Sequence, residues 1–194
     1  MTACLRGERT MSIRALRIVE KHGRRISAPC VALLGFMLSA CIDSTAPILS
    51  DGKPVFGEQA RFHLYSLYDG AAHQAQIVTF RWNGARYAVS GKRHDVSDFT
   101  IHDFEGNDAI VQGISVKKGR TIEYALARKL ADGTYLVIAI DENDADEPAR
   151  ATLCTKAKSS PCRIETRDQL LAFARATAAK PHQQGGLAVL VTGR

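Results

Sequence analysis

Residues 75–90, AQIVTFRWNGARYAVS, carry the clearest signal for the fold of this chain. Two segments rich in β-branched and aromatic residues flank Asn83-Gly84. Asn-Gly between such segments is the strongest short-range signal for a β-hairpin, because both central residues of a type I′ turn need a positive φ. The stretch therefore predicts two antiparallel strands joined by a tight turn.

Similar hairpin signals follow along the chain. Two more pairs of strand-like segments each enclose a short turn that contains glycine: FTIHDF and DAIVQGIS around residues 105–107, then TIEYALARKL and TYLVIAID around residues 131–133. Consecutive hairpins imply an antiparallel meander.

One helix and one further strand are expected near the C-terminus. Thr166 and Gln169 fit a capping box, and apolar residues form one stripe from Leu170 to Ala178. The run GLAVLVT at residues 186–192 predicts a strand that is buried on both faces and therefore central in the sheet. The predicted fold class is mainly β (β-rich α+β). It is an antiparallel meander of about seven strands, a sheet or partly closed barrel with one C-terminal helix packed on it.

The N-terminal part of the chain has the pattern of an export signal. Basic residues up to Arg25 precede an uncharged stretch over residues 26–40, which is shorter than the roughly 20 residues of a membrane-spanning helix. A basic region, a short apolar region and small residues before a cleavage site are typical of a secretory signal peptide. A start at Met11 would give a leader of ordinary length.

Residues 38–41, Leu-Ser-Ala-Cys, resemble the lipobox of bacterial lipoproteins. The resemblance implies that residues 1–40 are a cleaved signal peptide and that Cys41 carries a diacylglycerol and palmitate-type acyl chains. It also implies a lipid-anchored protein of the cell envelope. Because Ile42 rather than Asp follows the cysteine, the resemblance favours the outer membrane, with the protein facing the periplasm. The resemblance is confined to this targeting segment.

The chain after the leader divides into a tether and a domain. Residues 41–60 contain two prolines, two glycines and no periodicity, which predicts a lipidated cysteine followed by a flexible tether. Residues 61–194 have the length of a single β-rich domain. Of the net charge of +6, residues 1–40 carry +5. The remainder therefore has no excess of basic residues that would favour nucleic-acid binding.

The five cysteines have different predicted roles. Cys4 and Cys30 belong to the leader, and Cys41 is the lipidation site. The remaining pair, Cys154 and Cys162, predicts a disulfide, because an exported compartment is oxidising. A metal site there would need further nearby Cys or His ligands, so neither a metal nor a cofactor is predicted.

Motifs for catalysis are weak. Ser115 and Lys118 match the Ser-x-x-Lys pattern of penicillin-binding proteins and β-lactamases, but they follow a predicted strand, whereas that chemistry needs the start of a helix. His94 and His102 each precede an aspartate, which would suit a base with its orienting carboxylate. Adjacent residues on a strand point to opposite faces, however. No catalytic residue is predicted.

Two further groups of residues allow alternative interpretations. The acidic run DENDADE at residues 141–147 offers oxygen ligands for calcium but lacks the EF-hand order, so a solvated loop facing Lys156 and Lys158 is favoured. Aromatic residues on the proposed strands form core and cross-strand pairs or, less often, line a ligand cleft. They are Phe62, Tyr65, Tyr68, Phe80, Trp82, Tyr87, Phe99, Phe104, Tyr124 and Tyr135.

These patterns favour a membrane-anchored envelope lipoprotein with a non-catalytic role in ligand binding, partner binding or assembly. One alternative is an envelope hydrolase whose site is assembled from distant residues, including His94, His102 or Ser115. Another, by analogy of fold alone, is an inhibitor of an attacking enzyme. A pocket, and the side chains that line it, would distinguish a small-ligand site from a hydrolytic one.

Overall fold

The computed structural model describes residues 42–50, 52–68, 71–90, 96–116, 121–154, 162–181 and 185–191. All of them belong to one compact unit of the chain. The strands are β1 (Ile42–Ser44), β2 (Gln59–Tyr68), β3 (Ala71–Trp82), β4 (Tyr87–Ser90), β5 (Val96–Asp103), β6 (Asp108–Ser115), β7 (Ile122–Ala131), β8 (Thr134–Ala139), β9 (Cys162–Arg163) and β10 (Gly185–Leu190). The helices are the 3₁₀ helix η2 (Glu142–Asp144), α1 (Glu147–Leu153) and α2 (Arg167–Ala178).

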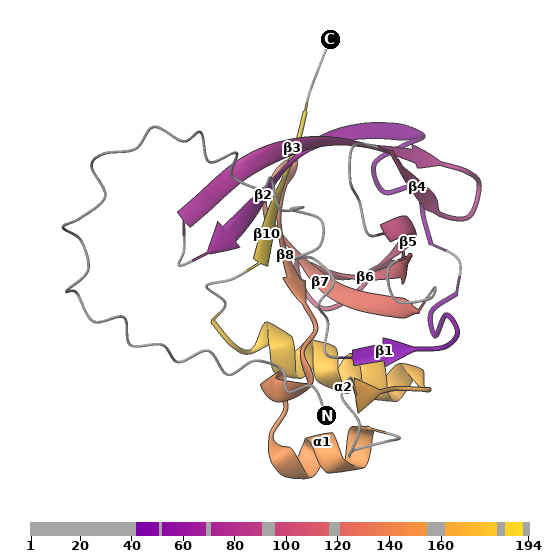
Figure 1. Ribbon diagram of the computed structural model, residues 1–194, viewed down its shortest axis with the longest axis vertical. Coiled ribbons are helices and arrows are strands. Elements are labelled where there is room, and N and C mark those ends of the chain that lie inside the picture. The colour runs from indigo at the N-terminus through magenta and orange to yellow at the C-terminus, as the bar shows by residue number, and fades with distance from the viewer. Residues whose placement is uncertain are drawn as a thin grey trace, which may run out of the picture. The chain divides into compact units, whose positions relative to one another are not determined.

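Eight of the strands form a closed antiparallel barrel (Figure 1). The order around it is β6-β5-β4-β3-β2-β10-β8-β7, and a further pairing of β6 with β7 joins the two ends. Closure removes the open edges that a flat sheet would present. The β1 and β9 strands extend the sheet from β7 outside this ring. The predicted fold class is confirmed, although the described residues form a 10-stranded sheet rather than seven strands.

The hairpin predicted from residues 75–90 joins β3 to β4. The last register pair is Trp82 with Tyr87, so the loop is longer than the predicted two-residue turn. The reason lies in the Asn83 side chain, whose oxygen accepts hydrogen bonds from the backbone amides of Ala85 and Arg86 at 3.1 and 3.0 Å. Gly84 has a φ of 99°, the positive value that the Asn-Gly signal predicts.

The last strand, β10, closes the barrel. It pairs with β2 along its whole length and with β8 from Gly186 to Val189. Its predicted central position is confirmed, but burial on both faces is wrong. Ala188 faces the lumen and is 7% exposed, whereas Leu187 and Val189 on the outer face are only partly buried. The outer face of β10 lacks full cover because α2 packs elsewhere.

Helix α2 covers the outer face of β7. Its capping box, Thr166 with Gln169, is present as predicted. Leu170 and Phe173 on its apolar stripe are fully buried against Tyr124 and other outward residues of the barrel wall. Figure 1 shows β1 and α2 on one side of the ring, next to β7, with α1 beyond α2. The protein therefore has two apolar cores, one inside the barrel and one between the barrel and α2.

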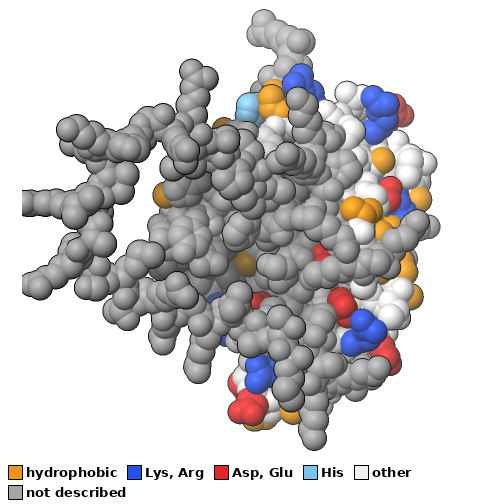
Figure 2. Space-filling view, viewed as in Figure 1, with side chains coloured by type: hydrophobic (Ala, Val, Ile, Leu, Met, Phe, Trp, Pro, Cys, Tyr) orange, Lys and Arg blue, Asp and Glu red, His pale blue; other side chains and the backbone are white. Residues whose placement is uncertain are grey.

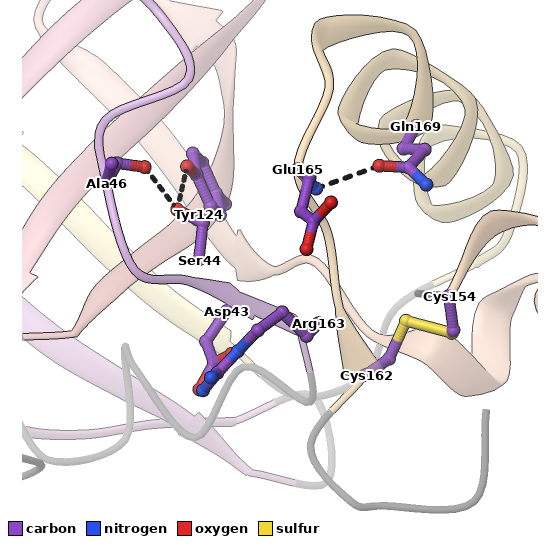
Figure 3. Close-up of polar contacts among 9 residues, drawn as sticks. All are labelled: Asp43, Ser44, Ala46, Tyr124, Cys154, Cys162, Arg163, Glu165 and Gln169. Atoms are coloured by element: carbon purple, nitrogen blue, oxygen red, sulfur yellow. Dashed lines mark hydrogen bonds and ion pairs between the residues drawn. A yellow bond between two sulfur atoms is a disulfide. The ribbon is translucent and has the colours of Figure 1, made fainter. Parts of the chain in front are cut away.

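The predicted flexible tether over residues 41–60 is wrong for the described residues 42–50 and 52–60. Ile42 is 0% exposed, and β1 pairs with β7 on one side and with β9 on the other. The Ser44 hydroxyl lies 2.6 Å from the hydroxyl of Tyr124 and donates to the carbonyl of Ala46 (Figure 3). Burial raises the pKa of Tyr124 to about 12, so its hydroxyl keeps its proton.

Beyond β1, a side-chain amide holds the segment against the outer wall. The Gln112 side-chain oxygen accepts hydrogen bonds from the amides of Ile48 and Leu49, both at 3.0 Å. Its nitrogen donates to the carbonyl of Leu49 at 3.2 Å. These bonds satisfy backbone groups that would otherwise need strand partners or water. The segment is therefore fixed without regular secondary structure.

Replacing Ile42 by Ala tests whether β1 is part of the folded domain. We expect the free energy of unfolding to fall by about 2–5 kcal/mol, because a fully buried isoleucine is cut back within a packed core. Thr45→Ala is the control. Thr45 lies three residues from Ile42 and is exposed, so Thr45→Ala should change the free energy of unfolding by no more than about 0.5 kcal/mol. Equal denaturation midpoints for the two variants would show that β1 does not pack on the barrel.

Candidate functional site

The interior of the barrel holds an apolar chamber of about 140 Å³, which is partly open. No polar atom contributes to its wall. The lining comes from the inward residues of the ring strands, together with Val55 and Phe56 from the segment before β2. An apolar space of this size inside the barrel is the strongest candidate for a binding site among the described residues.

The chamber exists because side chains of different size face each other across the lumen. One part of the wall is aromatic: Phe62, Phe80, Phe99 and Tyr135, from β2, β3, β5 and β8. Another part, on β6, β7 and β10, carries small residues: Ala109, Gly113, Ala125, Ala127 and Ala188. The interior of an eight-stranded barrel is just wide enough for side chains to fill it. Small residues on β6, β7 and β10 therefore leave space.

Ring contacts fix the aromatic part of the wall. The rings of Phe80 and Phe99 meet edge to face with centroids 4.7 Å apart, and those of Tyr87 and Phe99 stack at 5.3 Å. The rings of Phe62 and Phe80 lie 5.1 Å apart. Such pairs contribute about 0.5–1.5 kcal/mol each beyond the area they bury. The aromatic wall is thus held in place whether or not the chamber is filled.

Residues 52–58, which we call the strap, connect the outer segment to β2 and cross one end of the barrel. The amide of Gly52 donates to the carbonyl of Ala85 at 3.3 Å, and the amide of Trp82 donates to the carbonyl of Glu58 at 2.8 Å. Both partners lie at the β3–β4 turn. In Figure 1 the strap is part of the indigo chain between β1 and β2.

Phe56 closes the chamber at that end. Its ring centroid lies 4.9 Å from that of Phe62 and 5.5 Å from that of Tyr135, edge to face in both cases. Phe62 lies near the start of β2, and Tyr135 near the start of β8. The Phe56 ring therefore fills the space between strand ends that meet at the same rim.

The Tyr87 hydroxyl fixes the strap from inside the barrel. It accepts a hydrogen bond from the amide of Phe56 at 2.8 Å and donates one to the carbonyl of Gly57 at 2.9 Å. Burial raises the pKa of Tyr87, so the hydroxyl is protonated near neutral pH and makes both bonds. Tyr87 is 0% exposed, and without the strap its hydroxyl would lose both of these partners.

The structure does not bring the predicted catalytic candidates together. His102 lies on the outer face of β5, where its ring nitrogen Nε2 is 2.8 Å from the Thr100 hydroxyl, and desolvation lowers its pKa. Ser115 follows Gly113 in the alternation of β6 and so faces the lumen, where it is 2% exposed. His102 and Ser115 therefore lie on opposite faces of the wall. His94 and Lys118 lie outside the described residues.

The acidic residues 141–147 have structural partners. Asp141 caps η2, and Asp146 caps α1 by accepting the amide of Ala149 at 2.9 Å. Asp144 accepts the Thr177 hydroxyl at 2.8 Å, which ties this segment to α2. None of residues 141–147 is buried, as a solvated segment requires, but they form η2 and the start of α1 and not an irregular loop. Lys156 and Lys158 lie outside the described residues.

The predicted disulfide between Cys154 and Cys162 is confirmed, with Cα atoms 5.4 Å apart (Figure 3). It joins the end of α1 to β9. The Glu142 carboxylate lies close to both sulfurs, and burial raises its pKa. Because the sulfurs are bonded to each other, they do not offer thiolates to a metal. The predicted lipidation site, Cys41, lies outside the described residues.

Buried charges lie outside the apolar chamber. Asp43 is 4% exposed and forms an ion pair with Arg163, 3.0 Å between carboxylate oxygen and Nε (Figure 3). Glu123, which is 1% exposed, is opposite Asp43 in the β1–β7 register. Neither carboxylate is among the chamber residues. The Asp43–Arg163 pair joins β1 to β9, whereas Glu123 lies on the same face of β7 as the chamber residues Ala125 and Ala127.

Figure 2 shows one face of the molecule, with the described side chains coloured by type. In the coloured part of Figure 2, acidic and basic side chains are interspersed with hydrophobic ones. Within the described ranges, no helix combines the length and hydropathy needed to cross a membrane.

Comparisons of the chain with protein-family models, curated proteins and solved structures find no match. The chamber and the resemblance of residues 38–41 to a lipobox are therefore the features from which a function can be inferred.

Replacing Ala125 by Leu tests whether the chamber is open space. Ala125 is 2% exposed and lines it. Three added carbon atoms should raise the free energy of unfolding by about 2 kcal/mol, at roughly 0.8 kcal/mol per buried methylene. Ala72→Leu, at an exposed site on β3, should change it by less than about 0.5 kcal/mol. A loss of stability in Ala125→Leu, measured by chemical denaturation, would mean that the lumen is already filled.

Proposed function

We propose that the protein is a lipid-anchored protein of the bacterial cell envelope that holds one small apolar molecule inside its barrel. The observation that supports this proposal is the chamber of about 140 Å³ inside the barrel, to which no polar atom is exposed. An apolar cavity of similar volume in a protein core stays dry and binds benzene or xenon. Eight-stranded barrels in general can hold one small ligand.

The chemistry of the wall defines the ligand class. A polar atom placed in the chamber would lose its hydrogen bonds to water and gain none, at a cost of several kcal/mol. The volume limits the buried group to about the size of benzene. The ligand is therefore an uncharged molecule, or the end of one, that presents a single flat ring or a short branched hydrocarbon.

The targeting sequence supports the location. With Leu38-Ser39-Ala40-Cys41 as a lipobox, the acyl chains attach at Cys41, and the next residue, Ile42, is fully buried in the domain. Consecutive Cα atoms are about 3.8 Å apart, so the anchor has no spacer. The domain then rests against the bilayer surface, where apolar molecules concentrate. A barrel in that position can exchange such molecules with the membrane.

Labelling with a radioactive or clickable fatty acid tests the anchor. The wild type should incorporate the label, and Cys41→Ala should lose it and accumulate uncleaved precursor. Cys30→Ala is the matched control, because it removes a cysteine from the same N-terminal region outside the lipobox, and it should keep the label. Efficient cleavage and release of the Cys41→Ala protein would show that the leader is an ordinary signal peptide.

Titration with benzene tests the chamber as a binding site. The purified protein should show saturable binding by calorimetry, and Ala125→Leu should weaken it by at least about tenfold, equivalent to 1.4 kcal/mol. Ala72→Leu should bind as the wild type does. Absence of saturable binding to the wild type, or equal binding to all three proteins, would refute the chamber as the site.

A further inference from the structure

We propose that the position of the Phe56 ring is a second, exchangeable subsite, and that a ligand with two flat apolar rings occupies the chamber by displacing Phe56 and lifting the strap. This inference rests on the proposed function, that the chamber holds an apolar molecule. It adds the ligand class, a two-ring or similarly elongated hydrocarbon, and the end of the barrel through which it passes.

The surroundings of Phe56 are those of a bound ring. Its contacts with Phe62 and Tyr135 are edge to face, and the centroid of Tyr87 lies 5.9 Å away. The same Phe56 side chain also lines the chamber. Removing it would therefore join its own site to the chamber as one continuous apolar space. A ring supplied by a ligand would find the same aromatic partners.

The strap is attached more weakly than the barrel strands. Between Gly52 and Glu58 it forms no strand, and two of its backbone bonds, from Val55 to Lys53 and from Gly57 to Pro54, are internal. Lifting the strap leaves these internal bonds intact. What it breaks is a small set of contacts with the barrel.

Few contacts hold the strap to the barrel rim. Lys53 pairs with Asp103 at 3.1 Å, but both side chains are more than three-quarters exposed, and exposed pairs contribute little. Val55 is 51% exposed. The most buried attachment is the Tyr87 hydroxyl, which accepts a hydrogen bond from the amide of Phe56 and donates one to the carbonyl of Gly57.

A glycine permits the strap to turn next to Phe56. Gly57 has a φ of 74°, in the left-handed region that other residues rarely adopt, and an added Cβ there would meet no atom within 4 Å. The glycine is thus required by backbone conformation and not by crowding. It provides a pivot between Phe56 and the first residue of β2.

Naphthalene and benzene are the probes that separate the two subsites. Naphthalene should bind the wild type only with displacement of Phe56, whereas benzene fits the chamber without it. Phe56→Ala should bind naphthalene about tenfold more tightly, because the cost of displacement is removed. Its affinity for benzene should change much less. Phe56→Leu keeps an apolar side chain at the rim, so its affinity for naphthalene should lie between those of Phe56→Ala and the wild type. This variant also keeps the test available if Phe56→Ala does not fold.

Tyr87→Phe tests the attachment of the strap without changing the chamber. It removes the two hydrogen bonds and keeps the ring, so naphthalene should associate several-fold faster and bind more tightly, with little change for benzene. Lys53→Ala is the control within the strap, since Lys53 does not line the chamber. It should behave as the wild type does toward both probes.

Trp82 provides a direct readout of strap movement. It is the only tryptophan in the chain, its amide is bonded to Glu58 at the end of the strap, and its ring lies 5.1 Å from Tyr87. Naphthalene should increase quenching of Trp82 by acrylamide in the wild type, and benzene should not.

The outcomes separate the two proposals. Two results would overturn the exchangeable subsite while the chamber remains supported as a benzene site. In the first, benzene binds and Phe56→Ala leaves the affinity for naphthalene unchanged. In the second, benzene binds but naphthalene binds only after that substitution. No binding of either probe to any variant would overturn both proposals.

Discussion

The hydrogen-bonded closure of the barrel by β10 determines the rest of this structure. Because β10 pairs with β2 on one side and β8 on the other, the ring has a fixed radius and an inside. Gly185 makes this possible at the start of the strand, where a Cβ would lie 2.7 Å from the carbonyl oxygen of Val137. Once the ring is closed, the side chain of each residue in a ring strand points either into the lumen or to the outer face.

Because the barrel is closed, the difference in size between the small and the aromatic inward side chains leaves a chamber in the lumen. In an open sheet, small inward residues such as Ala125 and Ala127 could be covered by a layer that settles onto them. Inside a ring the wall cannot collapse onto them without breaking ladder hydrogen bonds, so the space between them and the aromatic wall persists. On the outer face of β7, by contrast, Tyr124 and its neighbours are covered by α2 and β1.

Local signals in the sequence predicted the local structure. The hairpin at Asn83-Gly84, the capping box of α2 and the disulfide depend on residues close in sequence. All three are present, although the hairpin loop is longer than predicted. The attachments of residues 42–58 were missed because their partners are distant: Tyr124 is 80 residues from Ser44, and Gln112 is 64 from Ile48. A segment rich in proline and glycine has no periodicity that would indicate such partners. A ligand cleft lined by the aromatic residues was only the less favoured interpretation for a related reason: alternation identifies two faces of a strand but not which one a closed ring encloses.

The central claim is that the closed barrel keeps an empty apolar chamber ready for a ligand, and crystals of the protein equilibrated under xenon test it most directly. Xenon enters dry apolar cavities of this size without needing polar contacts. The account predicts xenon density in the lumen between Phe80, Phe99 and Ala125, with the wall unmoved. Ordered water in that space, or side chains that have closed it and admit no xenon, would contradict the account.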